Sequence, residues 1–451
     1  MKVLLISANT ETSPYPVYPL GLDYVAGAIG SEHEVHLADL HHDSTDSMLK
    51  ERIKTIAPAI IGISIRNIDN TDHEAPRDYI EQCRHLIRSI RELSPAPVVL
   101  GGSGFSLFPT RLLRELGADY GIIGEGERFR DVLKAIEQQQ DVTRLEGVVS
   151  RNEQNPREPP RPWQGAISRC PVLDSPYVGY YLQHGGMLNL QTKRGCPFKC
   201  IYCTYPGIEG NRLRLTPPAA VADTALELQE AGAKYLFITD SVFNSDIQHS
   251  LQVARSLRQA GLSIPWGAYI APRRLPRGYF QELAAAGMSH VEFGTESLSD
   301  PVLESYQKPF RCLDVFQAHQ AAAQAGLHIA HFFLLGAPAE TPQTIEKTMQ
   351  KASWLPKTVC FFFTGIRLYP QTQLHDLALE SAQITKDQDL LRPYFYSPPG
   401  IGLEEIQTML AQGSRKQQNW ILGGSGQKMT RIISRLHARG HIGPLWEHLI
   451  P

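Results

Sequence analysis

The stretch Gly195-Cys-Pro-Phe-Lys-Cys-Ile-Tyr-Cys-Thr204 places three cysteines, Cys196, Cys200 and Cys203, close together. Three thiolates can bind three irons of a cubane cluster and leave the fourth iron without a protein ligand. Such an open metal position is available for chemistry, whereas a cluster with four thiolates mainly transfers electrons. The spacing therefore predicts a four-iron cluster with one open iron. The remaining cysteines are scattered singly, at Cys83, Cys170, Cys312 and Cys360.

Two other uses of these cysteines have to be weighed. A structural zinc site usually needs two CxxC-type pairs or a Cys/His set at tetrahedral spacing, and no His lies within a few residues of the three. A disulfide framework needs a denser and even set, whereas the chain has 7 cysteines in 451 residues. We therefore favour the cluster, and we interpret the four other cysteines as core residues or free thiols.

The composition limits the class of protein. A chain of 451 residues with 42% hydrophobic and 20% charged residues is typical of a soluble globular protein of two to three domains. The net charge of −2 gives no basic field for nucleic acid, so we expect no nucleic-acid partner. The N-terminus lacks the features of a signal peptide, and no apolar run is long enough to span a membrane. The sequence thus predicts a cytoplasmic protein.

Residues 1–150 read as alternating strands and helices, which predicts a parallel sheet covered on both faces. We expect the doubly wound, flavodoxin- or Rossmann-like α/β fold. Helices are expected at 20–29, 79–93 and 111–116, among others. The expected strands are residues 2–7, 35–37, 60–65, 98–100 and 120–123.

Polar or glycine-rich loops follow three of these strands, where this fold binds its ligands. Glycines let backbone N–H groups approach a ligand closely, and Ser and Asn side chains can hold its polar substituents. Each loop alone is best read as an ordinary turn, but three at one sheet edge predict a crevice for a large cofactor. No GxGxxG follows the first strand, which disfavours a dinucleotide. The candidate residues are Ser64, Arg66, Asn67, Asn70, Gly101, Gly102, Ser103, Gly124, Glu125 and Gly126.

The rest of the chain divides into three parts. Residues 151–185 are rich in proline and polar residues and are expected to form a linker. Residues 186–380 alternate again, with six expected strands at 188–192, 235–239, 266–270, 290–294, 329–335 and 360–369. Six β/α units are too few for an eightfold barrel, so we expect an open partial (β/α)6 barrel. Residues 381–451 are expected to form a small, mostly helical C-terminal region.

The cysteine loop matches the C-x3-C-x2-C signature of the radical S-adenosylmethionine (SAM) superfamily, with the aromatic Tyr202 before the last cysteine. Three later segments, residues 237–244, 292–297 and 333–341, resemble motifs of this superfamily in the same order. Residues 19–22, Asp39 and the glycine loops at 101–102 and 124–127 resemble landmarks of its cobalamin-binding class. The resemblance covers most of the chain, from the N-terminus to about residue 380.

The resemblance implies three cofactors: a 4Fe-4S cluster, SAM and cobalamin. It implies that Cys196, Cys200 and Cys203 ligate the cluster and serve the catalysis. It also implies that SAM is contacted by Tyr202, Asp240, Arg273, Glu296 and Ser297. A solvated turn for Arg273 and a helix cap for Asp240 are the alternative readings. For the ten loop residues named above, it implies cobalamin contacts.

A His ligand to cobalt is not expected. The D-x-H-x-x-G motif of proteins that supply one is absent after the first strand, and His41 and His42 follow the second strand instead. We interpret these two as surface residues. The lower face of cobalt is then expected to meet the loop 64–70 or water, with Arg66 and Asn67 as the first candidates.

The function that the resemblance implies is a cobalamin-dependent radical SAM methyltransferase. One SAM would methylate cobalt and a second would generate a substrate radical. The acceptor would be an unactivated carbon, or as second choice phosphorus, of a small molecule or lipid precursor, and an external flavodoxin- or ferredoxin-type protein would supply electrons. Two alternatives stay open: a radical enzyme without net methyl transfer, for cyclisation, ring contraction or C–C coupling, and a non-catalytic cobalamin or redox sensor. The substrate is expected near Tyr369 and the aromatics of 394–396, which could equally be core.

Overall fold

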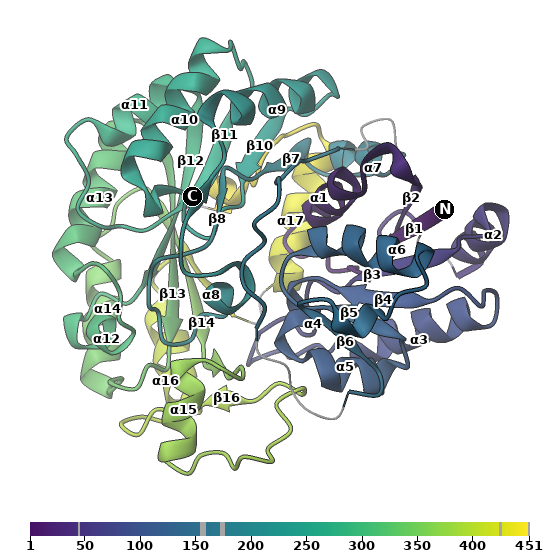
Figure 1. Cartoon of the computed structure of the whole chain (residues 1–451). Coiled ribbons are helices and arrows are strands. Elements are labelled where there is room, and N and C mark those ends of the chain that lie inside the picture. Colours follow the sequence, from purple (N-terminus) through teal and green to yellow (C-terminus); the bar gives the residue numbers. More distant parts are fainter. Residues whose placement is uncertain (44–45, 154–158, 172–175, 424–425, 450–451) are drawn as a thin grey trace.

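The computed structural model describes residues 1–43, 46–153, 159–171, 176–423 and 426–449. Two α/β units lie side by side, an N-terminal sheet domain and a larger partial barrel (Figure 1). Segments from both ends of the chain meet at the boundary between the units, since Thr430 of α17 (Gly426–Ala438) donates to Ser13 Oγ at 2.9 Å in the loop before α1 (Leu20–Ile29). The two units are therefore held together by more than the segment that connects them.

The N-terminal domain contains a six-stranded sheet in the order β2-β1-β3-β4-β5-β6. The five predicted strands are confirmed and run parallel, whereas β6 is antiparallel to β5 and was not predicted. The strand order reverses between β1 and β3, which is the point where doubly wound sheets bind ligands. The strands are β1 (Lys2–Ser7), β2 (Glu34–Asp39), β3 (Ile60–Ser64), β4 (Val98–Gly101), β5 (Tyr120–Ile122) and β6 (Val148–Ser150).

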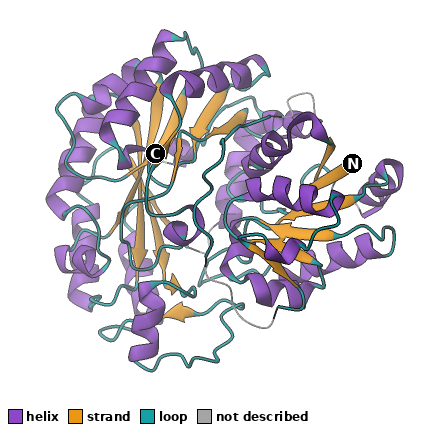
Figure 2. Cartoon of the chain, viewed as in Figure 1, coloured by secondary structure: helices purple, strands orange, loops and turns teal. Residues whose placement is uncertain are grey.

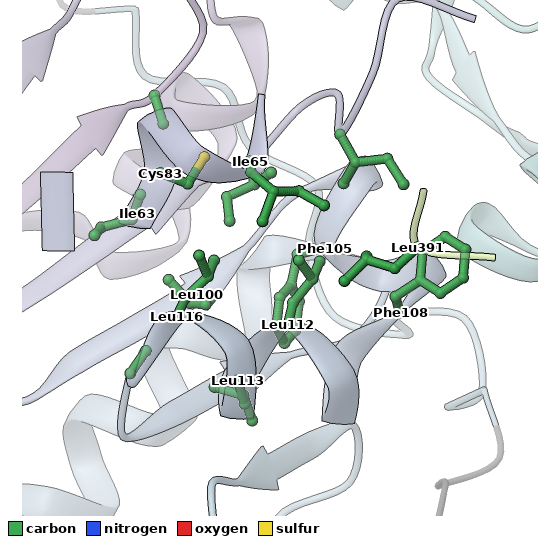
Figure 3. Packing of buried hydrophobic residues seen from close by; sticks show 14 of the residues in the cluster. Ile63, Ile65, Cys83, Leu100, Phe105, Phe108, Leu112, Leu113, Leu116 and Leu391 are labelled. Atoms are coloured by element: carbon green, nitrogen blue, oxygen red, sulfur yellow. The ribbon is translucent and has the colours of Figure 1, made fainter. Parts of the chain in front are cut away.

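Helices cover both faces of this sheet because its strands are apolar on both sides. Val3 and Leu5 pack with α1 and α6 (Phe129–Glu137), whereas Leu4 and Ile6 belong to the core of the opposite face. Figure 3 shows that second core, in which Leu100 and Phe105 lie near Leu112. The helices on that side are α2 (Asp46–Ile56), α3 (Ile80–Arg91), α4 (Ser103–Leu107) and α5 (Pro109–Leu116).

The partial barrel is a parallel sheet of seven strands in the order β17-β14-β13-β12-β11-β10-β7. The six predicted strands are confirmed. The seventh, β17, comes from the C-terminal region and pairs with β14, an addition that its three residues did not reveal. The strands are β7 (Met187–Leu190), β10 (Tyr235–Ile238), β11 (Trp266–Ile270), β12 (Met288–Glu296), β13 (His328–Leu335), β14 (Thr358–Thr364) and β17 (Trp420–Leu422).

Helices line the outside of this sheet (Figure 2). Val291 and Phe293 of β12 pack in the core on the helix side, so Glu292 and Gly294 point to the opposite side, which we call the inner face. Local signals begin the helices where expected: Asp246 accepts from His249 N at α10, and Thr341 caps α14 before Pro342. The outer helices are α9 (Pro218–Glu230), α10 (Ile247–Gln259), α11 (Tyr279–Ala285), α12 (Asp300–Ser305), α13 (Cys312–Gln324) and α14 (Pro342–Ala352).

The connecting segments are docked onto the N-terminal domain. The segment predicted as a linker contains α7 (Pro176–Gln183), whose Tyr181 donates to Asp39 Oδ2 at 2.6 Å; its residues 154–158 and 172–175 lie outside the described part. Leu391 packs beside Phe108 in the core of the N-terminal domain (Figure 3). The other C-terminal elements are β15 (Ile366–Arg367), α15 (Gln373–Glu380), β16 (Phe395–Tyr396), α16 (Leu403–Ser414) and α17.

None of the helices in the described ranges combines the length and apolar character that crossing a membrane requires.

Candidate functional site

The cysteine loop lies between β8 (Lys193–Arg194) and α8 (Tyr205–Glu209), beyond the carboxyl end of β7. Gly195 opens it with a φ of +86°, and a Cβ there would lie 2.2 Å from the carbonyl oxygen of Arg212. Only glycine therefore fits directly before Cys196. Backbone bonds fix the rest: Cys196 N donates to Gly210 O at 3.1 Å, and Cys203 N to Cys200 O at 3.1 Å.

The three thiols are free; Cys196 is buried, and Cys200 and Cys203 are partly buried. Burial raises the pKa of Cys203 to about 12 and raises that of Cys200, where Lys308 opposes the effect. Bound irons would lower the pKa of both thiols, because a coordinating thiol is deprotonated. Among the described residues no group of three or more Cys, His, Asp or Glu side chains is arranged to hold a metal ion, so the cluster ligands stay a prediction. Of the other cysteines, Cys83, Cys312 and Cys360 are buried and Cys170 is exposed, as predicted.

Tyr202 links the cysteine loop to the end of β12. Its hydroxyl donates to Glu296 Oε1 at 2.8 Å, and Lys308 Nζ donates to both atoms at 2.8 Å. Burial opposes the charge of Lys308, but Glu296 together with Cys200 and Cys203 raises the pKa of this ammonium. The predicted SAM residues Tyr202 and Glu296 thus meet beside Cys200, together with a cation that stays charged.

Asp240 holds the strand that precedes the cysteines. Its Oδ1 accepts from Thr192 N at 2.7 Å, and its Oδ2 accepts from Lys193 Nζ at 2.6 Å. The carboxylate is buried, and the pair with Lys193 excludes water. These contacts make Asp240 a residue that positions the cysteine loop, so the structure gives it no free oxygen for the predicted nucleoside contact.

The two other SAM candidates lie apart from each other. The guanidinium of Arg273 lies 5.9 Å from the ring centre of Phe198, a residue of the cysteine loop, so it is near the site. The hydroxyl of Ser297 is fully buried and lies 3.0 Å from Thr348 Oγ1 of α14. Ser297 therefore faces the helices, a packing role that differs from the predicted one.

A cavity of about 560 Å³ lies where the two units meet. Nine of the ten predicted cobalamin residues line it, all except Asn70. Thr204 and Tyr205, which directly follow the last cysteine, line it too, as do Gln191 and Thr239 of the barrel. The structure thus brings the three loops of the N-terminal domain and the cysteine loop of the barrel to one space.

The loops of the N-terminal domain are shaped for close approach. Gly102 has a φ of +97°, and a Cβ there would lie 2.6 Å from Ile65 O. Ser103 Oγ donates to Arg66 O at 2.8 Å, which joins two of the loops. Asn70 instead closes its own loop, since its Nδ2 donates to Ala75 O and its Oδ1 accepts from Arg77 N.

Glu125 is committed to ion pairs between the units. Arg194 and Arg214, paired in register on β8 and β9 (Arg214–Leu215), both donate to its Oε1, at 2.8 and 2.7 Å. Arg194 also lies 2.7 Å from Glu127. Burial opposes the charge of Arg194, but Glu127 and Glu125 raise its pKa. Sequence reasoning missed both arginines; the only signal was a basic pair directly before Gly195.

Among the described residues, no histidine lines this cavity. His41 is buried rather than a surface residue, which corrects that prediction: its ring packs against Tyr180 and Tyr181, and its Nε2 lies 3.1 Å from Glu11 O, outside the cavity lining. Arg66 and Asn67 do line the cavity, and the Arg66 side chain is exposed to it. Glycine backbone at two strand ends and this free guanidinium fit a large polar macrocycle.

Two families match the chain. The B12 binding domain matches residues 6–134, and the radical SAM superfamily matches residues 190–352. The first range contains the three glycine and polar loops, and the second contains the cysteine loop, Asp240 and Glu296.

The chain is also similar to individual proteins. It is 27% identical to tryptophan 2-C-methyltransferase of Streptomyces laurentii, over 82% of this chain and 73% of that protein. It is 28% identical to an uncharacterized methyltransferase of Pyrococcus horikoshii, over 84% and 83%. Its fold matches the radical SAM methyltransferase TsrM of Kitasatospora setae, solved with tryptophan and a SAM analogue, with a TM-score of 0.86, 22% identity and coverage of 99% and 97%. The chain thus joins a B12 binding domain to a radical SAM domain, and it belongs to the cobalamin-binding radical SAM enzymes.

Proposed function

We propose that this enzyme is a cobalamin-dependent radical SAM methyltransferase that methylates an unactivated carbon of a small molecule. The observation that carries the proposal is the shared cavity. Its walls combine Ser64, Gly101 and Gly124 of the B12 binding domain with Thr204 and Tyr205 after the cysteine loop. A methyl carrier and a SAM-binding cluster held on these walls would face the same substrate. The printed names of two similar proteins, both methyltransferases, support this reading.

The cofactors supply the reactive chemistry: the cluster delivers the electron that cleaves an S–C bond of SAM, and cobalamin carries a methyl group. The chain supplies binding and orientation. Cys196, Cys200 and Cys203 would hold three irons, and the fixed Tyr202–Glu296–Lys308 group beside them would bind polar groups of SAM. Lys308 stays charged there and suits an anion such as a carboxylate.

The loops of residues 64–70, 101–103 and 124–126 would hold cobalamin, and Arg66 would lie against its lower face. A lipid precursor or a phosphorus acceptor is the second choice of substrate. An external flavodoxin- or ferredoxin-type protein would supply the electrons, and we propose no nucleic-acid partner. Among the aromatics named for the substrate, Tyr369 lines the cavity, whereas Tyr396 is buried in the core of the N-terminal domain.

The test uses the full chain, reconstituted without oxygen with iron, sulfide and cobalamin. It is given a strong reductant, SAM with a deuterated methyl group, and a small-molecule extract of cells. We expect deuterated methyl groups in a product, together with S-adenosylhomocysteine and deoxyadenosine. The Cys200→Ala variant is the matched control and should form none of these.

Each other outcome contradicts the proposal in a different way. Consumption of a compound without label in the product would favour a radical reaction without methyl transfer. Cobalamin binding with no SAM cleavage under any condition would favour a sensor. Label transfer that persists in Cys200→Ala would show that the cluster plays no part.

A further inference from the structure

Glu292 lies on the inner face of the barrel among aromatic rings. On each strand, alternate residues pack against the outer helices, for example Ala268 and Ile270 of β11 and Val291 and Phe293 of β12. The residues between them point inward: Tyr269 lies opposite Glu292 in register, and Phe237 of β10 packs against Tyr269 with ring centres 4.9 Å apart. Phe332 and Phe361 continue this face on β13 and β14, 4.8 Å apart.

The carboxylate of Glu292 accepts one hydrogen bond, although a carboxylate can accept several. Its Oε1 accepts from Trp446 Nε1 at 2.9 Å, and its Oε2 has no partner among the described residues. The residue is only 3% exposed. Burial raises its pKa to about 7, and this bond to Trp446 opposes the shift only in part. A buried carboxylate without a compensating cation is costly and is retained mainly where a ligand uses it.

The tyrosine that lies opposite this carboxylate in register is exposed. Tyr269 is 43% exposed although its strand neighbours Ala268 and Ile270 are buried. Burial and the charge of Glu292 raise the pKa of Tyr269, and the charge of Arg66 opposes them. The same three influences act on the pKa of Tyr15, in the loop before α1. Arg66 lines the cavity between the two units, so this inner face lies directly beside that cavity.

We propose that Glu292 binds a protonated amine of the substrate, while Phe237 and Tyr269 contact the adjoining apolar part of the molecule. The inference rests on the proposed function, because it assigns the substrate class for the same site. An ammonium would give the free Oε2 its missing donor and would hold the carboxylate ionised. Aromatic rings beside it add cation–π attraction, which is strongest where water is excluded. A neutral alcohol of the same shape would gain neither the ion pair with Glu292 nor the cation–π attraction.

The geometry of the charges supports this choice over an anionic group. Arg66 acts on the pKa of Tyr269 and Tyr15, whereas burial raises the pKa of Glu292 and the bond from Trp446 opposes this shift. Among the described residues no cation pairs with Glu292, so a ligand can supply one. An anionic group at the same place would face the ionised carboxylate of Glu292, which accepts hydrogen bonds but donates none.

The test measures binding by calorimetry to the reconstituted full chain at pH 7.5, without SAM. The compounds are two amines and their matched alcohols, benzylamine with benzyl alcohol and tryptamine with tryptophol. We expect the wild type to bind at least one amine about tenfold or more tightly than its alcohol. Glu292→Gln should lose that preference while still binding Trp446 through its amide oxygen. Glu292→Asp keeps the charge and should retain a preference.

The control is Glu74→Gln, because Glu74 also has a pKa raised by burial but lies in a loop outside this face. It should bind like the wild type. Equal binding of amines and alcohols by the wild type, or a preference that survives Glu292→Gln, would overturn the inference. The assay involves no methyl transfer, so failure of the labelled-methyl experiment leaves its result intact.

Discussion

Arg194 reaches from the strand before the cysteines to Glu125 of the B12 binding domain, with Nη1 2.8 Å from Oε1. Both side chains are almost fully buried, at 7% and 4% exposure. Arg194 is two residues before Cys196, and Glu125 lies between two glycines of the predicted cobalamin loop. One ion pair therefore couples the position of the cluster ligands to that of the cobalamin loop.

Replacing Arg194 by Gln should disturb both halves of the site. It leaves Glu127 without its cation, and breaking a buried ion pair costs about 3–5 kcal/mol of folding free energy. We expect unfolding at lower urea concentration and weaker cobalamin binding, measured by fluorescence and by titration of the absorbance of cobalamin. Arg161→Gln is the control: its pair with Glu146 is exposed and contributes under about 1 kcal/mol. Equal effects of the two variants would contradict the coupling.

Replacing Cys200 by Ala should remove the cluster without unfolding the chain. Two thiolates cannot replace the three-point attachment, so iron content after reconstitution should fall to background, together with the visible absorbance of the cluster. The control is Cys170→Ala, because Cys170 is an exposed free thiol away from the loop. A variant of Cys200 that keeps its full iron content would exclude the assigned ligand set.

Replacing Gly102 by Ala should weaken cobalamin binding. The added Cβ would lie 2.6 Å from Ile65 O at a φ of +97°, so the backbone has to move where the ligand approaches. Such strain is about 1–3 kcal/mol, which corresponds to a loss of affinity of about 5- to 140-fold. Gly179→Ala in α7 meets no atom within 4 Å and should bind cobalamin like the wild type. Titration with cobalamin distinguishes the two, and unchanged affinity of Gly102→Ala would place cobalamin elsewhere.

Glu292 should make the protein less stable as the pH rises. Its pKa is about 7 in the folded chain and 4.5 as the reference value, so below pH 4.5 both states are protonated. Between pH 4.5 and 7 the unfolded chain loses this proton first, and folding stability falls by about 3 kcal/mol before it levels off. The variant Glu292→Gln should lack this contribution and exceed the wild type in stability at pH 8. Urea unfolding of the two apo proteins at pH 5 and pH 8 measures the difference. Identical pH profiles would show that Glu292 is ionised in the folded chain.

The local sequence pattern was sufficient to predict the longer strands and helices. The apolar runs Lys2–Ser7 and Ile60–Ser64 are strands because both of their faces are buried, and Leu20–Ile29 is a helix with its predicted bounds. The short strands β6 and β17 escaped prediction. Three residues carry no periodicity, and each strand is defined by its pairing with a neighbour: β17 pairs with the seven-residue β14, and β6 pairs with β5.

The sequence by itself determined the family, because three cysteines at fixed spacing after Gly195 form a local motif, and it predicted the cluster ligands. It also predicted the cobalamin loops from glycine and polar residues at strand ends, and the structure brings nine of the ten residues to one cavity. Only the tertiary structure decided what the charged side chains do. Asp240 and Glu125 looked like cofactor ligands but are neutralised by Lys193 and Arg194, and Glu292 is left with a free oxygen. Ion pairing depends on which distant residues come within reach, and a linear pattern does not contain those distances.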